Sequence, residues 1–210
     1  MNIRNGVLVA AGLAVVMAGC GGGVAVKKAD KVAAQAVAAP APATAAVEQR
    51  MPLDPKNAWV AVVTTDKGVI KFVLCDQKAP ITVANFVKLA DKGFYSGLVF
   101  HRVVPGFVIQ GGDPAGNGSG GPGYTIKGEF TDLPHLKGAV AMARTNDPDS
   151  AGSQYYICLD AQPFLNGKYA VFGYVLEGME VVTSIQMGDK MRDVKIEEMS
   201  RDKIPAWVPK

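Results

Sequence analysis

The sequence predicts a mainly β domain: a barrel of short strands with two helices that cap its ends. Two observations lead to this prediction. All 16 aromatic residues of the 210-residue chain lie at Trp59 or later, so one folded domain with a core begins near Asn57. From there on, short runs of strand-forming residues alternate with turns rich in glycine and proline, and two segments have helical spacing.

The first part of this domain predicts a hairpin followed by a helix. Strand-forming runs at residues 60–65 and 69–75 are separated by Asp66-Lys67-Gly68, which is typical of a hairpin turn. A proline then opens a helix at the first helical position, which proline favours, and a glycine ends it. The residues of this helix signal are Pro80, Val83, Phe86, Val87, Ala90 and Gly93.

The rest of the domain predicts more short strands and a second helix. Strand-like runs follow at residues 98–103, 107–110, 139–143, 154–158, 170–175 and 194–199. Residues 179–186 are expected to form the second helix, with Val182 and Ile185 facing inward. Cys75 and Cys158 lie in separate strand-like runs, where a cysteine acts as a small apolar side chain, so we expect both thiols to remain free.

Residues 1–19 have the composition of a signal peptide. Arg4 supplies a positive charge, and residues 6–19 form an uncharged, largely apolar run. That run is too short to span a bilayer, which needs roughly 20 residues. It ends in Met17-Ala18-Gly19-Cys20, which resembles the lipobox of bacterial lipoproteins, although leucine is commoner where Met17 stands. The resemblance implies a lipid on Cys20; an ordinary secretory signal with a chance cysteine is the alternative.

A lipid anchor would place the protein in the bacterial cell envelope, facing the periplasm. The glycine at position 21, rather than an aspartate, favours the outer membrane over the inner one. Residues 20–56, rich in alanine, valine and proline, are expected to form a tether; a flexible chain of this length spans about 30–35 Å. Residues 57–210 would form the folded domain, which we expect to be a monomer.

Several motifs suggest other chemistry but lack the required context. Residues 116–121 satisfy the G-x-G-x-x-G pattern, yet Pro122 follows where a helix would have to begin. Residues 147–152 imitate the start of a calcium loop, but Ala151 cannot coordinate a cation. The three cysteines and two histidines lack zinc-site spacing, and no serine lies in a nucleophile elbow. We therefore expect no metal and no cofactor.

The charge of the chain also argues against nucleic acid as a partner. The formal net charge is only +3, and no run of lysine or arginine forms a basic stripe.

Residues 100–113 carry the strongest functional signal. They place one cation, a phenyl ring and an amide among strand-forming residues, at Arg102, Phe107 and Gln110. A guanidinium in an apolar run requires a partner or a cleft, so Arg102 is either a functional residue or a salt-bridged or snorkelling one.

This segment resembles the signature of the cyclophilins, and the similarity extends over most of residues 57–200. Residues 117–121 resemble the glycine loop of that family, and three further segments resemble its other motifs: 142–145, 153–158 and 164–173. The resemblance implies a closed antiparallel eight-stranded barrel with a helix over each end. It also implies an enzyme that interconverts the cis and trans forms of X-Pro peptide bonds.

The resemblance also assigns the site residues. Arg102, Phe107 and Gln110 are expected to be catalytic, and Gln154 to orient the arginine and the substrate backbone with Gln110. The expected substrate-binding residues are Val108, Gly118, Ala143, Arg144, Gln154, Tyr156, Phe164, Leu165 and Tyr169. His101 resembles a structural position, and His135 is expected on a surface loop.

Some of these positions depart from the usual pattern of the family. Val108 is commonly methionine, and Tyr156 is commonly phenylalanine, so the tyrosine adds a hydroxyl to an apolar wall. Eukaryotic members commonly carry asparagine where Arg144 stands and histidine where Tyr169 stands. They carry tryptophan where Phe164 stands, and sensitivity to cyclosporin-type ligands is associated with that tryptophan.

The expected reaction suits these side chains. Rotation about an amide bond costs about 18–20 kcal/mol because resonance is lost, and X-Pro bonds exchange over tens of seconds or more. A catalyst needs no cofactor; it must bind the twisted bond better than either planar form. The partners would be unfolded or extended polypeptides that contain proline. Two alternatives remain: a module that binds proline segments with little turnover, and a lipoprotein that docks an envelope partner.

Overall fold

The computed structural model describes residues 54–209. The expected signal peptide, the candidate lipidation site Cys20 and the tether up to residue 53 lie outside the described residues. Within residues 54–209, no helix has both the length and the apolar character that crossing a bilayer requires.

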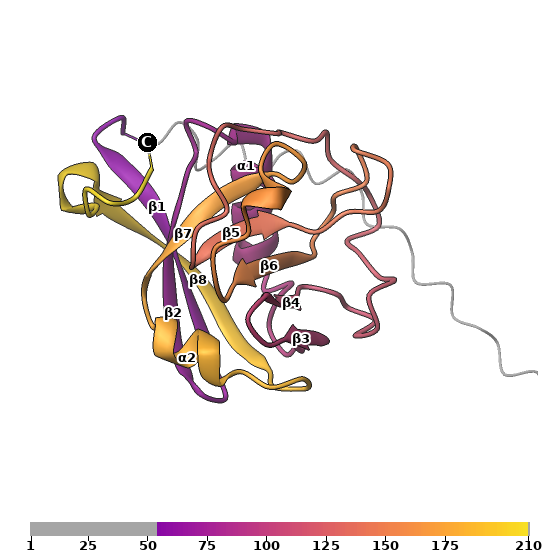
Figure 1. The fold of residues 1–210 in the computed structure, drawn as a ribbon. Helices are drawn as coiled ribbons and strands as arrows, with labels where there is room; N and C mark the ends of the chain where they lie inside the picture. The colour runs from indigo at the N-terminus through magenta and orange to yellow at the C-terminus, as the bar shows by residue number, and fades with distance from the viewer. Residues whose placement is uncertain (1–53, 210) are drawn as a thin grey trace, which may run out of the picture. The chain divides into compact units, whose positions relative to one another are not determined.

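Eight strands form one antiparallel sheet in the order β3-β4-β6-β5-β7-β2-β1-β8 (Figure 1). Their bounds are β1 (Asn57–Thr65), β2 (Gly68–Leu74), β3 (Arg102–Val104), β4 (Val108–Gly111), β5 (Ala139–Met142), β6 (Tyr155–Cys158), β7 (Val171–Glu177) and β8 (Met191–Ser200). Each lies where a strand-like run occurs in the sequence. The prediction of a mainly β domain with eight antiparallel strands is therefore confirmed.

The closed barrel that the resemblance implied is wrong: the sheet curls into a half-barrel, and its edge strands β3 and β8 form no ladder with each other. The expected strand at 98–103 is reduced to three residues that pair only with β4. Single backbone hydrogen bonds from loop residues cross the gap instead, such as Met191 N to Leu98 O at 2.8 Å and Phe100 N to Asp189 O at 2.9 Å. A loop in the place of a paired strand leaves the sheet open.

The two helices also agree with the prediction. Helix α1 (Pro80–Asp91) begins at its proline, and Gly93 adopts a φ of +67°, which ends the helix at little steric cost. Helix α2 (Met179–Ser184) is shorter than expected, and it lies against β2 (Figure 1). Its Val182 and the following Ile185 are buried, as expected.

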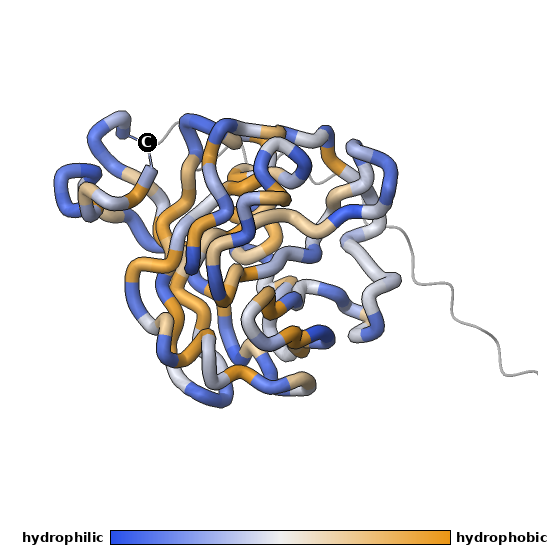
Figure 2. The backbone as a smooth tube through the Cα atoms, in the orientation of Figure 1, coloured by the Kyte–Doolittle hydropathy of each residue, from blue (hydrophilic) through white to orange (hydrophobic). Residues whose placement is uncertain are grey.

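The two faces of the sheet bury different clusters of side chains. Side chains alternate between the faces along a strand, so Ile109 and Tyr155 join the cluster around Phe86 of α1, whereas Val108 and Tyr156 join a second cluster. Figure 2 shows hydrophobic residues concentrated on the strands and hydrophilic residues in the connecting loops. The second cluster carries the candidate site.

Candidate active site

A row of side chains crosses four neighbouring strands on the face of the second cluster. The register pairs Arg102 of β3 with Gln110 of β4, Gln110 with Tyr156 of β6, and Tyr156 with Ala141 of β5. Residues at paired positions point to the same face of a sheet. Gln110 and Tyr156, which are 46 positions apart in sequence, therefore lie side by side.

A groove of about 390 Å³ lies over this row. Ten of the twelve candidate residues line it: Arg102, Phe107, Val108, Gln110, Ala143, Arg144, Tyr156, Phe164, Leu165 and Tyr169. The other two, Gly118 and Gln154, line an adjoining hollow of about 440 Å³ that shares Gln110, Ala143 and Arg144 with the groove. The structure thus brings all twelve into two connected depressions.

The guanidinium of Arg102 is held at the rim of the groove by two contacts. Its Nη1 donates to Gln110 Oε1 at 3.3 Å, and its Cζ lies 5.5 Å from the centroid of the Phe107 ring. Gln110 Nε2 in turn donates to Gln154 Oε1 at 3.0 Å. The arginine remains exposed, so donor capacity is left for a ligand.

The same chain of hydrogen bonds continues into the glycine loop. Gln154 Nε2 donates to the carbonyls of Gly118 and Gly120, at 2.9 and 2.8 Å. Asp113 fixes the loop from the other side by accepting backbone N–H groups that include that of Gly118. Burial raises the pKa of Asp113, but these backbone donors outweigh it and leave the pKa below its ordinary value. The loop and the arginine are therefore parts of one network.

Apolar side chains form the floor and one wall of the groove. Val108, Tyr156 and Leu165 are buried, whereas Phe164 is 59% exposed. The ring of Phe164 stacks on that of Phe107, with centroids 6.0 Å apart and planes 15° apart. A short 3₁₀ helix, η1 (Pro163–Leu165), presents Phe164 and Leu165 together. This arrangement suits a compact apolar ring lying against flat walls.

The expectation for His135 is wrong, because this residue is only 1% exposed. Its backbone N–H and its Nδ1 both lie within hydrogen-bond distance of Asn166 Oδ1, at 2.8 and 3.0 Å. Its Nε2 lies 3.0 Å from Tyr156 Oη. The hydroxyl that distinguishes Tyr156 from phenylalanine requires a partner when buried, and the buried imidazole supplies it.

These contacts determine the tautomer of His135. Asn166 Oδ1 can only accept, so Nδ1 must donate to it. In the neutral ring Nε2 then accepts, and the Tyr156 hydroxyl donates. Burial lowers the pKa of His135 and raises that of Tyr156, which is consistent with two neutral partners. Sequence reasoning did not predict this network, although the unusual tyrosine was a signal for it.

His101 does not line the groove. Its ring packs under the glycine loop, 3.9 Å from where a Cβ on Gly118 would stand. Neither ring nitrogen has a hydrogen-bond partner among residues 54–209, and burial lowers the pKa of the ring. In the same part of the chain, no cluster of three His, Cys, Asp or Glu side chains is arranged to hold a metal ion.

Comparison with known proteins shows which family shares this arrangement. Residues 60–204 match the sequence profile of the family described as "Cyclophilin type peptidyl-prolyl cis-trans isomerase/CLD". The chain is 49% identical to a peptidyl-prolyl cis-trans isomerase of Synechococcus elongatus over 138 residues, which are 65% of this chain and 94% of the relative. It is 52% identical to peptidyl-prolyl cis-trans isomerase B of Bacillus subtilis over 134 residues, 63% of this chain and 93% of the relative.

A solved structure with the same family description is also similar to this chain. The crystal structure of a Cryptosporidium parvum cyclophilin-type peptidyl-prolyl cis-trans isomerase matches with a TM-score of 0.63 at 30% identity. That match covers 67% of this chain and 98% of the other.

Proposed function

Because the chain belongs to the cyclophilin-type peptidyl-prolyl cis-trans isomerase family, we propose that its isomerase activity resides in the groove around Arg102. The single observation that supports this most strongly is the chain of contacts from Arg102 through Gln110 to Gln154. It holds a permanent cation beside a pocket with an apolar floor. That combination suits an X-Pro bond, which pairs an apolar ring with a polar amide.

In the proposed mechanism the proline ring lies against Phe107, Val108, Tyr156 and Leu165 while the amide turns. Loss of resonance localises a lone pair on the proline nitrogen, and Arg102 donates to that nitrogen and to the neighbouring carbonyl. These contacts strengthen as the bond twists, so they lower the barrier rather than merely bind the substrate. Arginine stays charged at all relevant pH values, so no protonation step is needed.

The test is Arg102→Ala, assayed on an X-Pro peptide and in a proline-limited refolding reaction. We expect kcat/KM to fall by at least tenfold while the circular dichroism spectrum is unchanged. The matched control is Arg192→Ala. It removes an arginine that pairs with Asp66 and lines neither the groove nor the adjoining hollow. Near-normal turnover by a folded Arg102→Ala protein would refute the mechanism.

The natural substrates in this proposal are proline-containing segments of unfolded or extended polypeptides. An open groove that continues into a second hollow supports this, because an extended segment can place its proline in the groove and its flanking backbone in the hollow. We propose that the active form is a monomer.

We also propose that a lipid on Cys20 anchors the enzyme in the bacterial envelope, facing the periplasm and attached to the outer membrane. The support is the run Met17-Ala18-Gly19-Cys20 after an apolar segment, with glycine following the cysteine. Mass spectrometry of the mature N-terminus tests this directly. Cys20→Ser should move the protein from the membrane fraction to the soluble one, and an unacylated Cys20 in the wild type would refute the anchor.

A further inference from the structure

Arg144 occupies a special place in the site, because its side chain lines both the groove and the adjoining hollow. It follows β5, and Ala143 beside it also lines both depressions. A substrate segment that fills the groove with its proline and continues into the hollow crosses the boundary that Gln110, Ala143 and Arg144 form.

The guanidinium of Arg144 is held in a defined position. Its Cζ lies 4.7 Å from the centroid of the Tyr169 ring and 5.4 Å from that of Phe130. Its Nε and Nη2 donate to the carbonyl of Lys168 at 3.0 and 2.7 Å, and its Nη1 donates to the carbonyls of Thr145 at 2.8 Å and Asn146 at 3.4 Å. A ligand that meets this cation therefore does not have to order a free side chain.

The charge of Arg144 is not neutralised by a carboxylate. Within residues 54–209 its hydrogen-bond and ring partners are carbonyl oxygens and aromatic rings, and neither Arg144 nor Arg102 forms an ion pair there. The carboxylates of the loop that follows Arg144 accept backbone N–H groups instead, Asp147 from Asp149 and Asp149 from Gly128.

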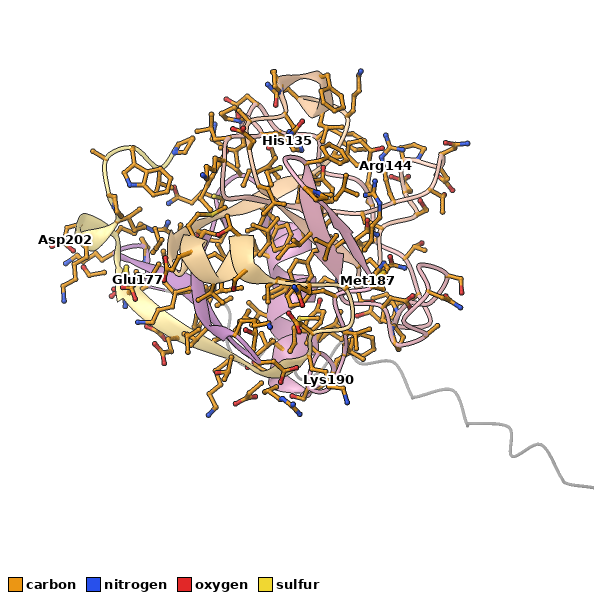
Figure 3. The ribbon with its side chains drawn as sticks, turned by 60° about the horizontal axis from the view of Figure 1, so that its bottom comes forward. His135, Arg144, Glu177, Met187, Lys190 and Asp202 are labelled. Atoms are coloured by element: carbon orange, nitrogen blue, oxygen red, sulfur yellow. The ribbon has the colours of Figure 1, made fainter. Side chains whose placement is uncertain are left out.

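The two depressions taken together are thus positively charged. The charged side chains that line them are Arg102 and Arg144, and the lining contains no acidic residue. Figure 3 shows Arg144 on the opposite side of the view from the labelled acidic residues Glu177 and Asp202. An unpaired, partly buried cation attracts an anion more strongly than a fully solvated one does.

We propose that Arg144 is a specificity-determining residue that makes the enzyme favour X-Pro segments with an acidic side chain close to the proline. The acidic side chain would lie in the adjoining hollow, where the positive charge of the guanidinium attracts it. This inference rests on the proposed function of the groove, and it adds a class of substrate to it.

The experiment uses peptides that differ only in one residue, Glu, Gln or Lys, at each position from three before to two after the proline. For the wild type at low salt we expect kcat/KM to be roughly three- to tenfold higher for Glu than for Lys at one or more positions. Because the interaction is electrostatic, about 0.5 M salt should reduce this ratio strongly.

Variants assign the preference to one side chain. Arg144→Gln should bring the Glu/Lys ratio close to one, and Arg144→Lys should retain a ratio above one because the charge remains. The matched control is Lys168→Gln, which removes a neighbouring cation outside the lining and should leave the ratio unchanged. The ratio is independent of any general loss of activity in these variants.

The outcomes separate this inference from the proposed function. Equal turnover of Glu and Lys peptides by the wild type at every position would overturn it, even with the isomerase activity intact. An equal drop in the ratio for Lys168→Gln would also overturn it, because the cause would be net charge. If Arg144→Gln does not fold, Arg144→Asn removes the same charge and should likewise bring the Glu/Lys ratio close to one. Normal turnover by Arg102→Ala would instead count against the proposed function.

Discussion

The hydroxyl of Tyr156 lies 3.0 Å from Nε2 of His135, and the two rings stack with their planes 17° apart. One partner forms the floor of the groove, and the other belongs to the loop before β5. The same histidine contacts Asn166, which directly follows the 3₁₀ helix that carries Phe164 and Leu165. A single buried imidazole therefore joins two sides of the groove.

This pair predicts an energetic coupling. Tyr156→Phe should lower the free energy of unfolding by about 1–3 kcal/mol, because Nε2 of His135 is left buried with no donor. His135→Leu should also destabilise the protein, and the double variant should lose less than the sum of the two losses. Urea denaturation measures all three.

The matched control for this cycle is Tyr124→Phe, which removes a different tyrosine hydrogen bond, to Asn85. Its effect should add to that of His135→Leu, because the two hydroxyls have separate partners. Additive losses for Tyr156→Phe and His135→Leu would contradict the coupling.

The buried His135 and the half-buried His101 predict that the free energy of unfolding falls in mild acid. Burial lowers the pKa of both His101 and His135, so the folded protein favours their neutral forms. As the pH falls below about 6.5, the unfolded chain takes up protons that the folded chain does not, and the free energy of unfolding decreases. For His135 the loss between pH 7.5 and 5.5 amounts to at most about 1.4 kcal/mol.

Urea denaturation at these two pH values checks the prediction. The difference between them should shrink in His135→Gln and, separately, in His101→Gln. The range from pH 5.5 to 7.5 lies above the ordinary pKa of an aspartate. The lowered pKa of Asp113 means that this carboxylate takes up its proton at still lower pH. A wild-type stability that is equal at both pH values, or higher at pH 5.5, would show that the histidines are not held neutral.

The exposed ring of Phe164 predicts weak inhibition by cyclosporin-type ligands. Phenylalanine keeps an aromatic wall beside Phe107, but it lacks the N–H donor of indole. A ligand carbonyl left without a partner costs about 1–3 kcal/mol, roughly ten- to hundredfold in affinity. Inhibition should become tighter in Phe164→Trp, although Tyr169 in place of histidine limits the gain.

An inhibition titration with peptide turnover as the readout checks this prediction. Wild-type turnover should persist at ligand concentrations that block a eukaryotic cyclophilin. Nanomolar inhibition of the wild type, or no gain from the tryptophan, would mean that Phe164 does not have the assigned place in the ligand site.

The thiols of Cys75 and Cys158 should be alkylated only slowly in the folded protein. Both Cys75 and Cys158 are free in the structure, and burial raises the pKa of each thiol to about 12. Since the thiolate is the reactive form, iodoacetamide at pH 8 should leave both unmodified in the folded protein and modify both after unfolding without reductant. Peptide-resolved mass spectrometry distinguishes them, and a thiol that stays unlabelled after unfolding would indicate a disulfide.

The sequence by itself determined where most strands and both helices of this protein lie, and its resemblance to a family indicated the candidate site residues. Alternation along a strand is a local property, so Val108 of β4 and Tyr156 of β6 lie in the groove, as the resemblance implied, while Ile109 and Tyr155 lie on the other face. Proline and glycine act through their own backbone torsions, which is why Pro80 and Gly93 marked the ends of α1 correctly.

Tertiary structure alone decided whether the sheet closes into a barrel and which groups form hydrogen bonds with the buried polar atoms. Whether β3 meets β8 depends on how the loop at 98–101 packs, so the closed barrel implied by the resemblance was wrong. Helix α1 has no local side-chain cap, and the carboxylate of Glu129, 47 residues from Thr82, accepts its N-terminal N–H groups. The contact between His135 and Tyr156 likewise joins residues that are distant in sequence. Such contacts join residues far apart in sequence, and no local pattern encodes the geometry that brings them together.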